Sequence, residues 1–485
     1  MKKLSLYIAS IMMLTTTSCA DFLEYKDKDK IEPSTLAHYS DLAYTELMQK
    51  ENSYELFYLN VMTDDLESSV TPSRPGLSDV DKRLTYGNYF LWAVNPQIQL
   101  DDKQQEDLTW ASAYKRILMC NIIEEKVNEF EDDKDGVKKR LIGETKFIRA
   151  LSYYYLMNIY GEPYQNEQQA KTALAVPINN EASINTIVYT RSTIEAVCSL
   201  IESNLKEAIV YFNEGEKKST IYRPKADAAR LLLSRLYLYT KQWQKAVDTC
   251  NELIATTSAS ITTRDVLTKI GTTSGIISYR NPAVLYTFGS MAIDYAFSAS
   301  ETAGRAFFIT SNSLLSLYEV GDLRKTNFFI PQQGLAYLNN KVSEASAREA
   351  KNMSFRLDEA YYNRAEAYIE LGETQKALDD LNFVRKDRYP LNANYRLTSS
   401  TQEDARQKMR DEKRREFCFE GLRWFDIRRW NLGVVHLYQD FGNPNNVARY
   451  ELKPGSPNYI MPLPLDLAAK NDKIEQFTRI ETLVR

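Results

Sequence analysis

Two segments of the chain repeat the same pattern of residues at a constant offset. Residues 236–246 read LYLYTKQWQKA and residues 367–377 read AYIELGETQKA, so that Tyr237 matches Tyr368 and Ala246 matches Ala377. Each copy has the pattern of a helix, a tight break and a second helix that begins near a Lys-Ala pair. A unit of this kind cannot bury its apolar face alone and must stack on its neighbours. The repeat therefore predicts a mainly α-helical fold of stacked hairpins.

Helical periodicity in the rest of the chain extends this pattern to four hairpins, which are similar to tetratricopeptide repeats. They pair residues 108–130 with 138–160, 193–213 with 224–240, 242–256 with 356–371, and 374–388 with 403–420. The third hairpin is interrupted by a long insertion. We still expect its helices to pack antiparallel, because the entropy of closing a loop grows slowly with loop length. Gly161 is expected to end one helix in the left-handed conformation.

Two long segments have no clear helical pattern. Residues 51–100 contain helix breakers throughout, and the insertion at about 257–355 is rich in Ser, Thr, Gly, Tyr and Phe. The breakers in the first segment are Pro72, Pro75, Gly76, Gly87 and Pro96. Binding groups are commonly carried by loops on a rigid scaffold. We therefore expect an irregular, loop-rich lobe that binds the ligand.

The N-terminus has the features of a bacterial export signal. Two lysines precede an apolar run, residues 4–14, that is too short to span a bilayer. Small residues then lead directly to Cys19, an order that resembles a lipobox, in which the cysteine becomes the acylated N-terminus. We expect cleavage of residues 1–18, lipidation of Cys19 and a tether over residues 19–33. The alternative is a plain secretory signal cut at the same place.

The body that follows the tether divides into an N-terminal region, residues 34–215, and a C-terminal region, residues 216–485, which contains the insertion. No later stretch reaches the roughly 18 consecutive apolar residues that a membrane-spanning helix needs. We expect the two regions to form one compact body.

Charge and cysteine content argue against several partners and cross-links. The formal net charge of -4 and the absence of a basic stripe argue against a nucleic-acid partner. Four cysteines follow the signal, Cys120, Cys198, Cys250 and Cys418, and their wide spacing favours buried thiols over a disulfide framework. The 32 Tyr and 5 Trp supply flat amphipathic side chains, which suit hydrated binding surfaces.

Three motifs of the C-terminal half resemble the SusD/RagB family. They are RAEAYIELGETQKALDDLNFVRKDR at 364–388, RDEKRREFCFEGLRWFDIRRWN at 410–431 and YIMPLPLDLAAKN at 459–471. The segment GETKFIRALSYYYLMNIYGEPY at 143–164 and the lipobox-like start extend the resemblance over almost the whole chain. The run Glu-Gly-Leu-Arg-Trp-Phe-Asp is its most specific part.

The resemblance implies a SusD-like fold, with tetratricopeptide-like hairpins and a ligand-binding face made of irregular segments. Members of this family sit on the outer membrane of Bacteroidota, facing outward as lipoproteins. They cap a SusC-like TonB-dependent transporter that takes in oligosaccharides or, in some branches, peptides. Fold analogy alone does not identify the ligand.

Residues 412–429 mix arginines and carboxylates with large aromatic residues. An anion-binding site is one interpretation of the arginines. Nearly equal numbers of both signs favour internal ion pairs that lock the last long helix to the scaffold. Glu416 and Glu420 lie one helical turn apart, but the arginines around them argue against glycoside hydrolysis, which needs a carboxyl group kept protonated by an apolar setting.

The sequence contains no assembled catalytic or metal site. Only two histidines occur, His38 and His436, and neither stands near other residues at metal-ligand spacing. Asp64, Asp65 and Glu67 give a weak calcium signal. We therefore expect no cofactor and no enzymatic activity.

Aromatic residues in the two irregular segments are our candidates for the ligand surface. They are Tyr86, Tyr89, Phe90 and Trp92 in the first segment, and Tyr286, Phe288, Tyr295 and Phe297 in the insertion. The C–H faces of sugar rings stack on flat aromatic faces. Trp92 is the preferred single residue because Trp has the largest stacking area; packing in the core is the alternative for all eight.

These observations lead to one function with two alternatives. The expected function is capture of an oligosaccharide at the cell surface and its delivery to a partner transporter. A peptide-binding lipoprotein is the first alternative, and a glycoside hydrolase is the second. Failure to retain any glycan or peptide, with the transporter still bound, would instead indicate a helical-repeat adaptor that binds only proteins.

Overall fold

The structure of the protein is a computed structural model. It describes residues 33–49, 56, 58–68, 77–184, 188–217, 220–270, 275–288, 308–332, 336–339, 341, 353–439 and 446–484. Cys19, the signal peptide and the tether residues before Pro33 lie outside this described part. Within it, none of the helices is apolar over a length that could cross a membrane.

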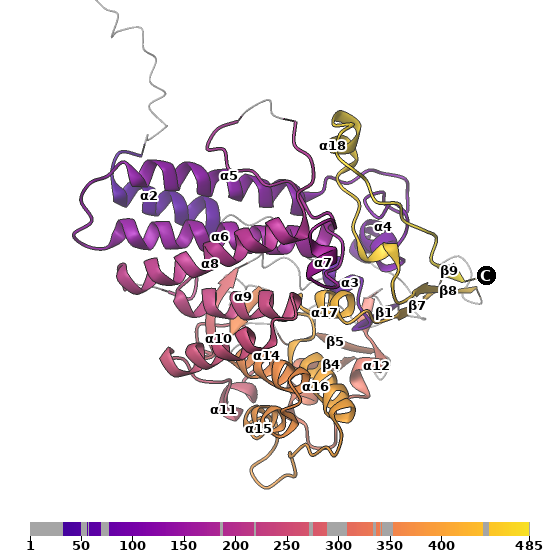
Figure 1. Ribbon diagram of the computed structural model, residues 1–485. Helices are drawn as coiled ribbons and strands as arrows, with labels where there is room; N and C mark the ends of the chain where they lie inside the picture. The colour runs from indigo at the N-terminus through magenta and orange to yellow at the C-terminus, as the bar shows by residue number, and fades with distance from the viewer. Residues whose placement is uncertain are drawn as a thin grey trace, which may run out of the picture.

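An array of helices forms the scaffold, and each helix contacts the next one along the chain (Figure 1). The array consists of α5 (Leu108–Asn128), α6 (Val137–Tyr160), α8 (Ile194–Glu214), α9 (Ala226–Tyr239), α10 (Trp243–Thr256), α14 (Leu357–Glu370), α15 (Thr374–Arg385) and α16 (Gln402–Phe417). The members of each predicted pair are in contact. The predicted mainly α fold with four hairpins is confirmed.

The interrupted hairpin closes as expected. Arg364 of α14 donates to Asn251 Oδ1 of α10 at 2.7 Å, between the middles of the two helices. Thr262, which follows α10, donates its backbone N–H to Asp358 Oδ1 at 2.9 Å, at the beginning of α14. The helices therefore run antiparallel, and the scaffold continues across the insertion.

The two copies of the repeated segment share the same turn. Lys241 between α9 and α10 has φ +56°, and Gly372 between α14 and α15 has φ +82°. The next residue in each copy donates its N–H to the matching tyrosine, Gln242 to Tyr237 O and Glu373 to Tyr368 O, both at 2.8 Å. A left-handed residue at this position reverses the chain within a few residues. The repeat is thus present in the structure as well as in the sequence.

Helix starts follow the capping residues of the sequence. The side chains of Asp107, Thr193 and Thr401 accept backbone N–H bonds at the beginnings of α5, α8 and α16. The predicted conformation of Gly161 at the end of α6 is wrong, because its φ is -92°. Glycine is needed there for close packing, since a Cβ would lie 2.7 Å from the Met157 carbonyl oxygen.

The first irregular segment contains a helix that the sequence did not predict, α4 (Leu77–Phe90). Gly87 lies inside α4 and does not break it. A Cβ on Gly87 would lie 2.3 Å from Cδ1 of Leu100, so the glycine lets the returning chain pack directly on the helix. Tyr86, Tyr89 and Phe90 therefore belong to a helix and not to a loop.

The insertion contains small sheets and short helices. Strand β2 (Val284–Phe288) pairs with β6 (Met353–Arg356), and β4 (Phe329–Gln332) pairs with β5 (Ala336–Asn339). Strand β1 (Leu66–Ser68), from the first irregular segment, pairs with β3 (Phe308–Thr310), from the insertion. The two segments expected to form the ligand face are therefore joined to each other.

A three-stranded antiparallel sheet near the C-terminus was not predicted. It contains β7 (Val434–Gln439), β8 (Val447–Leu452) and β9 (Leu483–Val484), in that order. The remaining elements are α2 (Leu36–Ala43), a π-helix (Tyr44–Gln49), α3 (Tyr58–Val61), α7 (Glu167–Ala170), α11 (Arg264–Leu267), α12 (Asn312–Leu315), α13 (Leu323–Phe328), α17 (Arg423–Arg429), a 3-10 turn (Pro457–Tyr459) and α18 (Leu465–Lys470).

Candidate functional site

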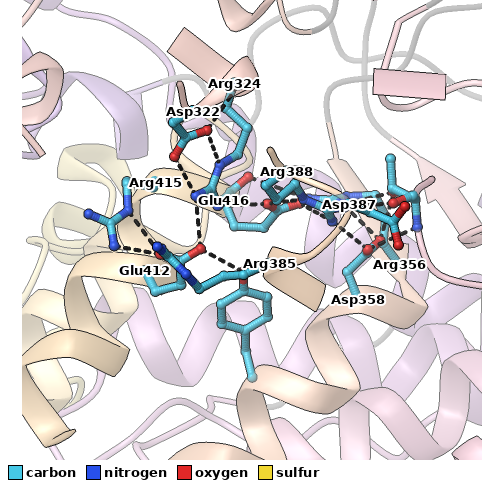
Figure 2. Close-up of polar contacts among 12 residues, drawn as sticks. Asp322, Arg324, Arg356, Asp358, Arg385, Asp387, Arg388, Glu412, Arg415 and Glu416 are labelled. Atoms are coloured by element: carbon cyan, nitrogen blue, oxygen red, sulfur yellow. Dashed lines mark hydrogen bonds and ion pairs between the residues drawn. The ribbon is translucent and has the colours of Figure 1, made fainter. Parts of the chain in front are cut away.

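A network of buried ion pairs occupies the region around α16 (Figure 2). Glu412 and Glu416 of α16 lie at its centre, and both side chains are fully buried. Glu416 accepts from Arg388 Nε at 2.9 Å and from Arg356 Nη1 at 3.1 Å. Arg324, which belongs to the insertion, places Nη2 2.8 Å from Glu412. The network joins the insertion to the last helices of the scaffold.

The arginines keep these carboxyl groups ionised. Burial alone would raise the pKa of Glu416, but the charges of Arg388 and its neighbouring arginines outweigh burial and hold this pKa well below its usual range. Glu420 also has a lowered pKa, because burial is outweighed by Arg356, whose Nη2 lies 2.8 Å away. The predicted structural role of this charged run is confirmed. A lowered pKa is the opposite of what a general acid needs, so the paired carboxylates give no support to hydrolysis.

The acidic residues that gave a weak calcium signal also accept hydrogen bonds from other groups of the protein. Asp64 accepts two hydrogen bonds from Arg423, both at 2.8 Å, and Asp65 accepts from Arg414 Nε at 2.7 Å. Glu67 accepts from the backbone and side chain of Asn312. Among the described residues, no group of three or more His, Cys, Asp or Glu side chains is arranged to hold a metal ion.

The aromatic residues chosen in the first irregular segment are core residues. Trp92 is fully buried, its indole N–H donates to the Met62 carbonyl at 3.0 Å, and its ring stacks on His436 at 4.2 Å. Phe90 is also fully buried and stacks on the other face of His436 at 3.9 Å. Tyr86 and Tyr89 are 8% and 6% exposed. The prediction that these four rings form an exposed platform is wrong, because α4 and the turn that follows it place them in the core.

The residues chosen in the insertion are only partly described. Tyr286 is 1% exposed on β2, and its ring packs edge to face against Phe147 at 5.4 Å. Phe288 is partly buried and, with Tyr286, lines a cavity of about 40 Å³. Pockets that hold a small ligand are usually about 300 Å³ or larger, so this cavity is too small for a sugar ring. Tyr295 and Phe297 lie outside the described residues.

A larger open groove is lined by residues from the first turns of α5, the loop after Pro177 and the segment that begins with α18. Its volume is about 340 Å³. It is lined by Trp110, Tyr114, Pro177, Asn179, Val188, Tyr189, Leu467, Lys470, Asn471 and Ile474. A volume of this size, with mostly apolar and aromatic walls and a few polar groups, is typical of small-ligand sites.

The sequence assigned the wall residue Trp110 no role and placed Tyr114 on the packing side of its helix. Trp110 and Tyr114 are one turn apart on α5, and their rings lie 4.7 Å apart and remain partly exposed. The sequence feature that could have identified this wall is an aromatic pair, one helical turn apart, that follows the N-cap residue Asp107. The opposite walls come from residues 177–189 and 467–474, which only the fold brings near α5.

A buried carboxyl group, that of Asp107, positions the aromatic residues of the groove wall. Asp107 accepts the Trp110 backbone N–H at 3.0 Å and the Tyr160 hydroxyl at 2.7 Å. Tyr160 in turn packs edge to face against the Trp110 ring at 5.0 Å. Burial raises the pKa of Asp107 to about 6, although these hydrogen bonds oppose the change. Trp110 is therefore held in place before any ligand arrives.

Comparisons with known proteins identify the family of the chain. A sequence model of the SusD family matches residues 310–478, and a second, described as starch-binding associating with outer membrane, matches residues 21–238. The chain belongs to the SusD/RagB family. A SusD-like protein of Formosa agariphila is 20% identical to this family member and aligns over 96% of each chain.

Solved structures support the same fold for this SusD/RagB protein. A SusD superfamily protein of Bacteroides thetaiotaomicron matches with a TM-score of 0.72 and 20% identity, over 92% of this chain and 100% of that chain. A SusD-like carbohydrate binding protein of Bacteroides vulgatus matches with a TM-score of 0.66 and 18% identity, over 90% and 96% of the two chains. The predicted SusD-like fold is confirmed.

Proposed function

We propose that this SusD/RagB protein captures an oligosaccharide in the groove between α5 and α18 and passes it to a partner TonB-dependent transporter. The groove carries the proposal. Its volume of about 340 Å³ accommodates a sugar ring, and Trp110 offers a partly exposed aromatic face. Sugar C–H faces pack on such rings, while nearby polar groups meet the hydroxyls.

Capture and delivery require no bond to be broken. An acyl chain on Cys19 and a tether over residues 19–33 would hold the binder at the outer surface of the outer membrane. A tethered binder raises the local concentration of ligand beside a transporter. Moderate affinity then allows the ligand to leave into the channel.

A charge placed on the wall of the groove tests the site. Val188 is 55% exposed there, so Val188→Glu should fold normally while putting a hydrated carboxylate where a sugar ring would stack. We expect at least about a tenfold loss of affinity, measured by titration calorimetry with the best ligand from a panel of oligosaccharides. Trp110→Ala should cause a similar loss.

The matched control is Val210→Glu, because Val210 is 53% exposed on α8 and does not line the groove. This variant should bind like the parent. Equal affinity of the parent, Val188→Glu and Trp110→Ala would remove the groove from the binding site. Release of new reducing ends from any bound oligosaccharide would show hydrolysis and contradict a purely binding function.

A further inference from the structure

The polar groups of the groove indicate which chemical class of sugar it can bind. Several of them are already used within the protein. The Tyr114 hydroxyl donates to the Pro177 carbonyl at 2.7 Å, the Tyr189 hydroxyl donates to Asn179 Oδ1 at 3.1 Å, and Asn471 Nδ2 donates to the Tyr189 carbonyl at 2.9 Å. These bonds position the walls.

The groups left for a ligand are hydrogen-bond donors. Among the described residues, neither the Trp110 indole N–H nor Asn179 Nδ2 has a hydrogen-bond partner. Lys470 adds an ammonium group whose nearest carboxylate, on Asp466, is 3.6 Å away, with both side chains largely exposed. An exposed pair of this kind is weak and easily exchanged.

Acidic side chains are missing from the described lining of the groove, whereas Lys470 is present. Arg191, two residues after the wall residue Tyr189, is 8% exposed and bonds to the carbonyls of Tyr160, Ala175 and Glu475. Among the described residues Arg191 forms no salt bridge, but the carboxylates of Glu475 and Glu162 interact with its charge, as does Tyr114 in the groove wall. The lining therefore offers the positive charge of Lys470 and N–H donors beside apolar and aromatic walls.

We infer that the groove selects a sugar ring bearing an anionic substituent, a carboxylate or a sulfate ester. The ring packs on Trp110, and the anionic group takes hydrogen bonds from Asn179 and Lys470. This inference rests on the proposed function, because it names the class of oligosaccharide bound at the same groove. Anionic oxygens accept several hydrogen bonds each, which matches a site that supplies donors.

Matched ligands test this selectivity with the mature chain. The carboxylate arm compares oligogalacturonides with the same chains after full methyl esterification. The sulfate arm compares sulfated galactan oligosaccharides with the desulfated product. We expect the charged member of at least one pair to bind more tightly, with an affinity that falls as salt is added.

Two variants test whether Lys470 and Asn179 cause the preference for charged ligands. Lys470→Gln should weaken binding of the charged ligand by about two- to fivefold, the size expected for an exposed ion pair, and weaken the neutral ligand less. Asn179→Asp keeps the Oδ1 acceptor for Tyr189 and replaces the free donor with a negative oxygen. It should weaken the charged ligand more than the neutral one. Lys473→Gln is the control, since Lys473 is close in sequence but does not line the groove.

The outcomes separate the two proposals. Equal binding of charged and neutral ligands, or loss of both to the same extent in Asn179→Asp, overturns the inference and leaves glycan capture standing. Binding of no oligosaccharide of either kind overturns both. Tighter binding of a short peptide with an apolar side chain and a free carboxylate would assign the same donors to a peptide and overturn the inference.

Discussion

At the scale of single residues, buried charges are stabilised by close partners of opposite sign. Glu366 on α14 is 2% exposed and accepts hydrogen bonds from Nη1 and Nη2 of Arg429 in α17, with 2.6 Å to Nη2. The Trp430 indole N–H also donates to it at 2.9 Å. Burial raises the pKa of Glu366, but the charges of Arg429 and Lys413 outweigh burial and lower this pKa to about 2.

Glu366→Gln should lower the free energy of unfolding at neutral pH by about 3 kcal/mol, because the buried cations Arg429 and Lys413 then share Asp426 as their remaining carboxylate among the described residues. The ordinary pKa of this carboxyl is 4.5, so its stabilisation is complete above pH 4.5 and is lost as the pH falls toward 2. Urea unfolding of parent and variant at several pH values should show their difference shrinking over this range.

Glu370 is the control for this prediction. It lies one turn later on α14, and its pair with Arg406 is partly exposed, at 2.7 Å. Glu370→Gln should cost less than about 1 kcal/mol. Equal effects at both positions would show that the burial of the Glu366 pair is unimportant.

At the scale of elements, the two copies of the repeat share the same turn although the residue at its left-handed position differs. Lys241 and Gly372 occupy the same left-handed position, although only glycine adopts it without strain. Lys241 is tolerated because the hydrogen bonds on both sides of it are made, including Thr240 N–H to Leu236 O at 2.9 Å. The fold thus accepts a local cost of about 1 kcal/mol in one copy.

Gly372→Ala isolates this local cost. A Cβ at Gly372 meets no atom within 4 Å, so a change in stability reports backbone conformation and not a clash. We expect the free energy of unfolding to fall by about 1 kcal/mol. Gly372→Asn should cost less, because asparagine adopts this conformation more readily. Thermal melts of the two variants check the order, and a more stable alanine variant would contradict the explanation.

At the scale of the whole molecule, ion pairs and strand pairing hold the irregular segments on the helical scaffold. Arg324 of the insertion reaches Glu412 and Glu416 of α16, and β1 pairs with β3 across the two irregular segments. These contacts join the irregular segments to the scaffold within the protein itself. Its attachment depends on the N-terminal cysteine alone in our proposal.

Cys19→Ala should move the protein from the membrane fraction to the soluble periplasmic or secreted fraction, because the acyl chains are the proposed anchor. Fractionation followed by immunoblotting measures this. Cys198→Ala, at a half-buried thiol in the body, is the control and should remain with the membrane. A Cys19→Ala variant that stays as firmly bound as the parent would contradict lipidation.

Purification of the parent from solubilised outer membranes should also bring down a large β-barrel protein, and its repeated absence would contradict delivery to a transporter.

The sequence by itself determined the helical scaffold, the closed third hairpin and the ion-paired nature of residues 412–429. Each of these depends on periodicity, on a local repeat or on the balance of nearby charges, which are properties of short stretches of chain. Only the tertiary structure decided which aromatic rings are exposed. Gly87 allows Leu100 to pack on α4, and contacts with Met62 and His436 hold Trp92 in the core. The return of the C-terminal segment beside α5 leaves Trp110 facing a groove. Exposure depends on contacts between distant segments, and a pattern of aromatic residues in one segment contains no information about those contacts.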